Sequence, residues 1–179
     1  DIKDNYEMYD GFVILHGTDT MAFTASALSF ILQDLSKPVI VTGSQIALSQ
    51  LRSDGQINLL NSLYIAANYP ISEVSLFFNN TLFRGCRTTK VNSESFDAFA
   101  SPNYPCLMEA GINICLKAGE ISSGSNKPLL VTKIKPQAIS IVTLYPGITS
   151  NVLENFLHQE TKALILLTYG AGNAPKNHE

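Results

Sequence analysis

The chain has 179 residues, 45% of them hydrophobic, and a formal net charge of −3. This length and composition can bury the core of one large domain or of two smaller ones. The slightly negative charge excludes a basic surface for nucleic acid or for an anionic membrane, and the apolar runs, which are only of strand length, exclude a transmembrane helix.

The cysteines indicate the compartment in which the protein works. There are three of them, Cys86, Cys106 and Cys115, and an odd number without a CxxC pair does not make a disulfide framework. We therefore expect reduced, packed thiols in a reducing compartment, with no secretory signal peptide. The histidines are scattered, so the sequence predicts no metal site. No GxGxxG follows the first predicted strand, which argues against a dinucleotide cofactor.

Predicted strands and helices alternate in the first half of the chain. Residues 1–10 carry no periodicity and predict a loop or a short helix. The elements that follow are a strand at 12–15, a helix at 20–35, a strand at 39–42, a helix at 56–68 and a strand at 73–78. This order is typical of a parallel α/β sheet with right-handed crossovers.

Each predicted helix has one apolar face at helical spacing, which we expect to pack on the sheet. In the first helix this face contains Phe23, Ala27, Phe30, Ile31 and Leu35. In the second helix it contains Ile57, Leu60, Leu63, Tyr64 and Ala67. Asp54 directly precedes the second helix, and aspartate is a favoured N-cap residue, so we expect it to cap that helix.

The second half of the chain is less regular. Residues 81–91 predict a short strand pair around Arg84-Gly85, and 118–128 is a Gly- and Ser-rich linker. We therefore expect a first domain at 1–117 and the start of a second at 129–179. The second contains a strand at 139–144, a helix capped by Thr149 or Ser150, and a strand at 163–167. The predicted fold is an open, mainly parallel sheet flanked by helices, with the start of a smaller second α/β domain.

Polar turns that contain glycine follow four of the predicted strands. They are His16–Thr20, Gly43–Gln45, Arg87–Lys90 and Gly170–Asn173. In a parallel sheet the first two turns lie side by side at the carboxyl edge, where ligands bind and where helix N-termini favour anionic groups. On the local pattern alone, the simpler interpretation is that Asp19 or Thr20 caps the next helix.

Six segments together resemble one enzyme family. They are HGTDTMAFTASALSF, PVIVTGSQ, LRSDGQINL, RGCRTTKVN, FDAFASPN and YGAGNAP. The sequence is similar to the L-asparaginase family over nearly its whole length, and most similar to the cytoplasmic type I branch. The resemblance implies an amidohydrolase that releases ammonia from L-asparagine with threonine residues and no cofactor. It also implies a homodimer or homotetramer with active sites between subunits.

The resemblance assigns catalytic roles to three positions. Thr18 matches the second threonine of the catalytic set, Asp19 its aspartate partner and Lys90 its lysine. Amide hydrolysis needs an activated hydroxyl or water and a site for the oxyanion. A lysine accepts a proton only if burial lowers its pKa, and a nearby carboxylate opposes that shift. We expect a coupled relay in which Asp19 also binds the substrate ammonium. Taken alone, Lys90 is more simply interpreted as a surface lysine.

Further positions have counterparts in the family. Ser44 matches a residue that lies against the substrate side chain, and many relatives have proline where this chain has Ala47. Asn173 matches an asparagine that one subunit contributes to its neighbour's site, although asparagine also suits a turn there. Thr89 resembles part of a second, regulatory asparagine site. At Leu167 that branch often has arginine, and leucine cannot bind a carboxylate bidentately, so the chain departs from the pattern for regulation by asparagine.

One family motif is missing. The family's primary nucleophile is the threonine of a Thr-Gly-Gly-Thr-Ile-like turn, and this sequence contains no such turn. We therefore expect an internal piece of a longer asparaginase that is inactive by itself. Two alternatives stay open. One is a relative that acts on glutamine within a transamidation complex, and the other is a non-catalytic, truncated or regulatory subunit that binds a partner through its unclosed sheet.

Overall fold

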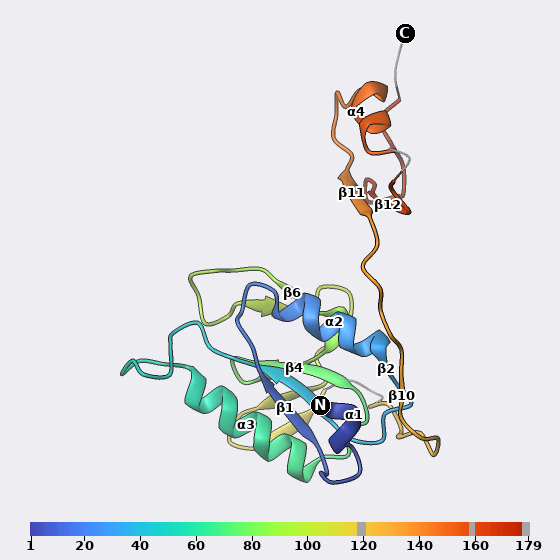
Figure 1. Cartoon of the computed structure of the whole chain (residues 1–179). Coiled ribbons are helices and arrows are strands. Elements are labelled where there is room, and N and C mark those ends of the chain that lie inside the picture. Colours follow the sequence, from blue (N-terminus) through green and yellow to red (C-terminus); the bar gives the residue numbers. More distant parts are fainter. Residues whose placement is uncertain (118–120, 158–159, 177–179) are drawn as a thin grey trace. The chain divides into compact units, whose positions relative to one another are not determined.

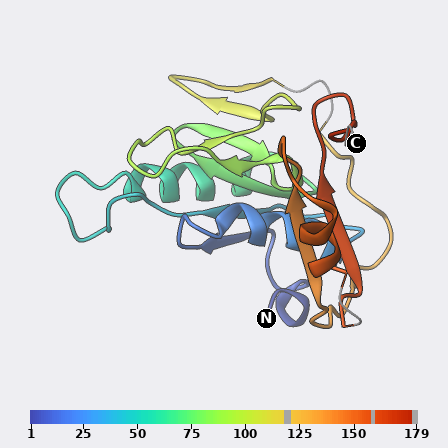
Figure 2. The same ribbon diagram turned by 90° about the horizontal axis from the view of Figure 1, so that it is seen from above.

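A computed structural model describes residues 1–117, 121–157 and 160–176 (Figures 1 and 2). The chain forms two compact units, Asp1–Lys133 and Ile134–Glu179, which are described separately. The predicted linker at 118–128 begins with three residues outside the described ranges. The units divide after Lys133 because strand β10 (Leu130–Val131) pairs with β2 (Leu32–Gln33) of the first unit. None of the helices in the described ranges is long and apolar enough to cross a membrane.

The first unit is built on a six-stranded sheet with the order β1-β3-β4-β5-β8-β9. These strands are β1 (Phe12–Leu15), β3 (Val39–Thr42), β4 (Val74–Phe78), β5 (Thr81–Arg84), β8 (Met108–Ala110) and β9 (Ile114–Leu116). The first three pair in parallel, whereas β4–β5, β5–β8 and β8–β9 pair antiparallel. The α/β class is confirmed, but the sheet is mixed rather than mainly parallel.

A tight turn at Asn79 and Asn80 explains the change of direction after β4. Both residues have positive φ, 45° and 60°, which asparagine tolerates and a two-residue hairpin requires. The prediction of a strand pair around Arg84-Gly85 was therefore wrong. β5 pairs with β4, and the 3-10 helix η1 (Gly85–Arg87) leads to β6 (Thr89–Lys90), which pairs with β7 (Phe99–Ala100).

Two helices cover opposite faces of the sheet (Figure 1). α2 (Met21–Ile31) packs on the face that contains Val39 and Val41, and α3 (Gly55–Asn68) packs on the face that contains Ile40. β1, β3 and β4 lie next to one another in this order and are parallel. The crossover from β1 to β3 runs through α2 on one face, and the crossover from β3 to β4 runs through α3 on the other face. Two crossovers that advance in the same direction over opposite faces have opposite hands. One of the two crossovers is therefore left-handed, contrary to the prediction that both are right-handed.

Most of each predicted apolar face points away from the sheet, and only Ile31 and Leu35, at the end of the first predicted helix, pack against the core. α2 buries small residues and one methionine, whereas Phe23 and Phe30 are 74% and 66% exposed. α3 buries Asn58 and Ser62, whereas Ile57 and Leu60 are 58% and 65% exposed. Periodicity shows which apolar residues share one face of a helix, but it does not show which part of the protein packs on that face. Stripes of large apolar side chains on an isolated unit mark surfaces for other polypeptide.

The remaining elements are short. α1 (Ile2–Asn5) precedes β1. In the second unit, β11 (Ile139–Thr143) and β12 (Ala163–Leu167) pair in parallel, and α4 (Ser150–Asn155) lies between them in the chain. This order confirms the predicted strand–helix–strand pattern. The small core of this unit consists of Val142, Leu144 and Ile148, with partly buried neighbours from α4.

Candidate functional site

The carboxyl ends of β1 and β3 lie side by side, because the two strands pair in parallel with Leu15 opposite Thr42. The backbone N–H of His16 donates to the carbonyl of Thr42 over 2.8 Å, which extends the pairing into the turns. A Cβ atom at Gly43 would lie 2.2 Å from the carbonyl oxygen of His16. Only glycine therefore allows the two turns to approach this closely. The expectation that they share one edge is confirmed.

Lys90 connects the first turn to a distant part of the chain. Its Nζ donates to Thr18 Oγ1 over 2.8 Å and to Asp19 Oδ1 over 2.7 Å. The lysine side chain is 17% exposed, so it is not an ordinary surface lysine, whereas the Asp19 side chain is 93% exposed. The hydrogen bond from Lys90, and then its charge, hold the pKa of the Asp19 carboxyl below its usual range. The site thus presents an ionised carboxylate to solvent.

The path of the backbone brings Lys90 to the N-terminus of α2. Gly85 fits tightly, since a Cβ there would lie 2.9 Å from the carbonyl oxygen of Val74 and 3.1 Å from that of Ala25 in α2. The Thr88 hydroxyl then donates to the carbonyl of Arg84 over 2.8 Å, which fixes the exit from η1. The tight fit holds η1 against α2, so that β6 begins beside the turn that contains Thr18.

The two residues expected to cap α2 do not do so through their side chains. Thr20 occupies the N-cap position but makes no side-chain cap hydrogen bond. The Asp19 carboxylate accepts a hydrogen bond from Lys90 instead. Asp54 behaves in the same way at α3, where it occupies the predicted N-cap position without a side-chain cap hydrogen bond. The carboxylates of Asp19 and Asp54 therefore bind groups other than the helix N-termini that they precede.

Gln45 is a residue that the sequence analysis did not single out. Its Oε1 accepts a hydrogen bond from the Thr18 hydroxyl over 3.0 Å, and its Nε2 donates to the carbonyl of Ser95 over 3.0 Å. The amide therefore sets the direction of the Thr18 proton, which points to Gln45, while an oxygen lone pair faces Lys90. The sequence did offer one indication of a role for Gln45, because this residue lies in the same polar turn as Ser44, at the end of a predicted strand.

The other predicted site positions are distributed over both units. Ser44 is half-buried in the turn after β3. Thr89, Lys90 and Asp19 line a cavity of about 440 Å³ together with side chains of α2. Asn173 is in the second unit, where its carbonyl accepts a hydrogen bond from the backbone N–H of Tyr169 over 3.0 Å and closes a turn.

Leu167 and the three cysteines are the remaining positions that the sequence singled out. Leu167 ends β12 of the second unit and is 49% exposed. Cys86, Cys106 and Cys115 are free thiols. Within the three described ranges, no group of three or more His, Cys, Asp or Glu side chains is arranged to hold a metal ion.

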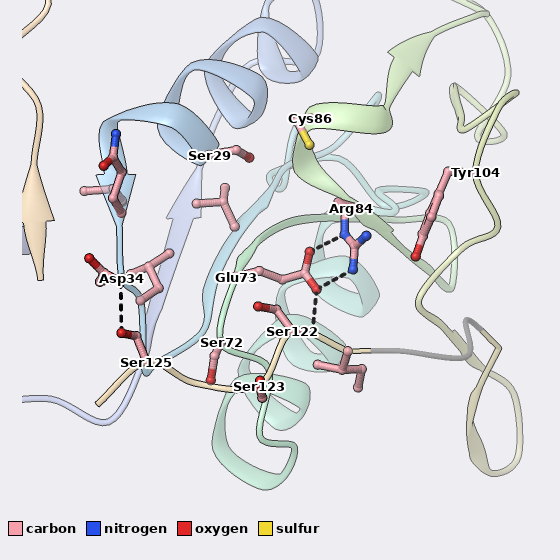
Figure 3. A pocket seen from close by; sticks show the side chains of 15 residues that line it. Ser29, Asp34, Ser72, Glu73, Arg84, Cys86, Tyr104, Ser122, Ser123 and Ser125 are labelled. Atoms are coloured by element: carbon pink, nitrogen blue, oxygen red, sulfur yellow. Dashed lines mark hydrogen bonds and ion pairs between the residues drawn. The ribbon is translucent and has the colours of Figure 1, made fainter. Parts of the chain in front are cut away.

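A larger cavity of about 830 Å³ lies at the opposite end of β4 (Figure 3). Glu73 and Arg84 line it and are paired directly, with Nε–Oε2 and Nη2–Oε1 distances of 2.6 and 3.1 Å. The backbone N–H of Ser122 also donates to Glu73, and the guanidinium lies 4.6 Å from the ring centre of Tyr104. The hydrogen bond with Glu73 raises the pKa of Arg84. Both charges are paired within the protein, so we assign this ion pair a role in stability and not in ligand binding.

Comparison with known proteins bears on the whole chain. Residues 1–121 match the family model described as Asparaginase, N-terminal. Over 177 residues the chain is 65% identical to L-asparaginase 1 of Escherichia coli (strain K12), a match that covers 99% of this chain and 52% of that protein.

Solved structures agree with this match. L-asparaginase I from Vibrio cholerae O1 biovar eltor superposes with a TM-score of 0.94 at 60% identity and covers 99% of this chain and 54% of that one. The probable cytoplasmic L-asparaginase from Campylobacter jejuni superposes with a TM-score of 0.81 at 28% identity, covering 98% and 58%. The chain spans about half the length of the curated relatives it matches. The resemblance found in the sequence is confirmed, and the chain belongs to the asparaginase family.

Proposed function

We propose that the protein containing this chain hydrolyses L-asparagine to L-aspartate and ammonia, with Thr18, Asp19 and Lys90 in its active site. The observation that carries this proposal is the position of Lys90 Nζ, within 2.8 Å of the Thr18 hydroxyl and 2.7 Å of the Asp19 carboxylate. These groups lie at the carboxyl edge of parallel strands, in a chain of the asparaginase family.

Each group has a chemical task in this proposal. Lys90, after it has released one Nζ proton to solvent, accepts a proton through the Thr18 hydroxyl from a water that this hydroxyl holds. The resulting hydroxide hydrolyses the acyl group that forms on the primary nucleophile of the upstream turn. The Thr18 proton points to Gln45 in this structure, so the transfer requires the hydroxyl to rotate. Asp19, ionised and exposed, binds the ammonium group of asparagine. Backbone N–H groups near Thr18 stabilise the oxyanion.

Other parts of the proposal follow the family. Ser44 contacts the substrate side chain, and Asn173 completes the site of a neighbouring subunit in a homodimer or homotetramer. The primary nucleophile is the threonine of the family's Thr-Gly-Gly-Thr-Ile-like turn, and no cofactor takes part. We place the enzyme in the cytoplasm, as the name of the Campylobacter relative has it for that protein.

Regulation is the point at which this chain departs from its family. Thr89 belongs to the proposed effector site, but Leu167 offers no charge for the carboxylate of a second asparagine. We therefore expect a hyperbolic dependence of rate on asparagine concentration. A sigmoidal dependence in steady-state kinetics would contradict this expectation.

The direct test is ammonia release from L-asparagine by a protein that carries this stretch together with the family's upstream threonine turn. Lys90→Met should abolish release. Lys117→Met is the matched control, because Lys117 is an exposed lysine paired with Glu109 over 3.0 Å on the β8–β9 hairpin. Release that is lost in the first variant and kept in the second supports the proposal. A folded parent protein that releases no ammonia overturns it.

A further inference from the structure

We infer that Asp54 is a positioning residue for this site: its carboxylate fixes the turn after β3 and, through Gln45, orients the hydroxyl of Thr18. This role deepens the proposed function and rests on it, because that function is what gives the Thr18 hydroxyl its task. Asp54 itself touches none of the proposed reacting groups.

The carboxylate of Asp54 binds the backbone of the turn rather than its own helix. Its Oδ1 accepts hydrogen bonds from the backbone N–H groups of Gln45 and Ile46, each over 3.0 Å. Its Oδ2 accepts from the same N–H of Gln45 over 3.1 Å. Hydrogen bonds to an ionised acceptor are roughly twice as strong as neutral ones. Two successive amides of the turn are therefore held by one charged group.

Asn58, one helical turn further along α3, holds the other side of the same turn. Its side chain is buried, and Nδ2 donates to the carbonyl of Gly43 over 2.9 Å and to Asp54 Oδ2 over 3.2 Å. Its Oδ1 accepts from the backbone N–H of Asn79 over 3.1 Å, which ties the group to the end of β4. The turn from Gly43 to Ile46 is thus fixed to α3 on both sides.

The segment between β3 and α3 needs such a support. Figures 1 and 2 both show it extending beyond the sheet, and Leu51 within it is fully exposed. At its base the Ser53 hydroxyl donates to the carbonyl of Ile46 over 2.7 Å, close to the Asp54 contacts. Without these bonds the base of the loop could move, and Gln45 would move with it.

Gln45 transmits this placement to Thr18. Its amide bridges the Ser95 carbonyl and the Thr18 hydroxyl, both over 3.0 Å, so a shift of its backbone breaks at least one of the two bonds. A misplacement of about 1 Å far from the reacting atoms can lower a rate by about 10²-fold. Asp54 therefore acts on the proposed relay without contact to it.

The helix itself does not depend on this carboxylate. Asp54 makes no side-chain cap hydrogen bond to α3, and the backbone N–H of Gly55 donates to the Ser53 hydroxyl over 3.0 Å. Removal of the Asp54 charge should therefore affect the turn more than the fold. This separation makes the inference testable.

The test uses the full-length protein and compares Asp54→Asn with Asp10→Asn, a matched change at an exposed aspartate. Asp54→Asn keeps the shape of the side chain but replaces one acceptor oxygen by a donor. We expect kcat for ammonia release per folded molecule to fall by about 10- to 100-fold. The double variant with Gln45→Ala should be no slower than Gln45→Ala alone, because Asp54 acts through Gln45.

Hydrogen exchange of the Gln45 and Ile46 amides, read by NMR, separates this inference from the proposed function. The two amides should exchange faster in Asp54→Asn than in Asp10→Asn, whether or not the parent protein is active. A parent without activity overturns the proposed function, and the exchange rates then decide the role of Asp54 alone. Unchanged exchange, unchanged kcat, losses that add to those of Gln45→Ala, or a lower melting temperature with full activity per folded molecule would each overturn the inference.

Discussion

Lys90 and Asp19 form an ion pair at the carboxyl end of the parallel strands, and Arg84 and Glu73 form another at the opposite end. In the first pair the lysine side chain is 17% exposed and the aspartate 93%. In the second pair the exposures are 23% and 12%, and two hydrogen bonds join the partners. One pair therefore leaves its carboxylate open to solvent, whereas the other encloses both charges.

The two pairs use similar chemistry for two different purposes. A bidentate, enclosed pair has no charge left for a ligand, and breaking it leaves a poorly solvated carboxylate, so its effects fall on stability. A pair whose carboxylate is exposed adds little stability, since water already solvates that carboxylate, but it keeps a charge and a hydroxyl within reach of a substrate. Variants at the two ends should therefore separate activity from stability.

The largest effect is expected from the pair of Lys90 and Asp19, whose carboxylate is open to solvent. In the full-length protein, Thr18→Ala, Asp19→Ala and Lys90→Met should each lower kcat/KM by at least about 10³-fold, because the three groups act as one relay. Double variants should be barely worse than single ones. The measurement is steady-state ammonia release, with folding checked by circular dichroism. Losses that add from one variant to the next would contradict a shared relay.

Gly43→Ala should disturb the ends of β1 and β3, from which the turn with Thr18 and Asp19 begins. The new Cβ would lie 2.2 Å from the carbonyl oxygen of His16, so the ends of β1 and β3 must separate. We expect a loss of about 3 kcal/mol in the free energy of unfolding in urea, together with reduced activity. Gly17→Ala is the control, because a Cβ there meets no atom within 4 Å. Equal stability of the two variants would refute the close-approach argument.

Arg84→Met should affect stability alone. The change removes both hydrogen bonds from Arg84 to the poorly exposed Glu73 carboxylate and leaves the one from the backbone N–H of Ser122. The free energy of unfolding should therefore fall by about 2 kcal/mol. Ammonia release per folded molecule should stay at the parent level, because the pair lies at the other end of the sheet. A loss of activity without a loss of stability would reverse the comparison between the two ends.

The sequence predicted the elements of the sheet better than their arrangement. β1, β3 and α3 lie within one residue of their predicted bounds, because short apolar runs and helical spacing are local signals. The prediction of which helix face is buried was wrong for α3 and for most of α2, since Ile57 and Phe23 are exposed. The hand of one crossover was also wrong, because periodicity says nothing about which face of a sheet a helix covers.

The site shows the same limit at the level of side chains. The family motifs pointed to Thr18, Asp19 and Lys90, which the fold brings together across more than 70 residues of chain. Gln45 escaped notice because its contact with Thr18 depends on strand pairing and not on spacing. Asp54 was expected to cap α3, but its carboxylate binds the turn after β3, a partner that only the folded chain provides.

The smallest effect concerns the ionisation of Asp19. The hydrogen bond from Lys90 and its charge lower the pKa of this carboxyl, so Lys90→Met should raise the pKa towards its ordinary value. NMR titration of the Asp19 carboxyl carbon measures the shift. In the parent protein the contribution of the pair to stability is present above about pH 3.9, the pKa of an unfolded aspartate, and is lost as the pH falls through the lower folded value.

Arg84→Met is the control for this titration, because a change in the enclosed pair should leave the pKa of Asp19 where it is. An unchanged Asp19 pKa in Lys90→Met would mean that the two side chains are not paired in solution. The carboxylate would then remain exposed but without its cation, and the open end of the sheet would lose the feature that distinguishes it from the enclosed pair of Arg84 and Glu73.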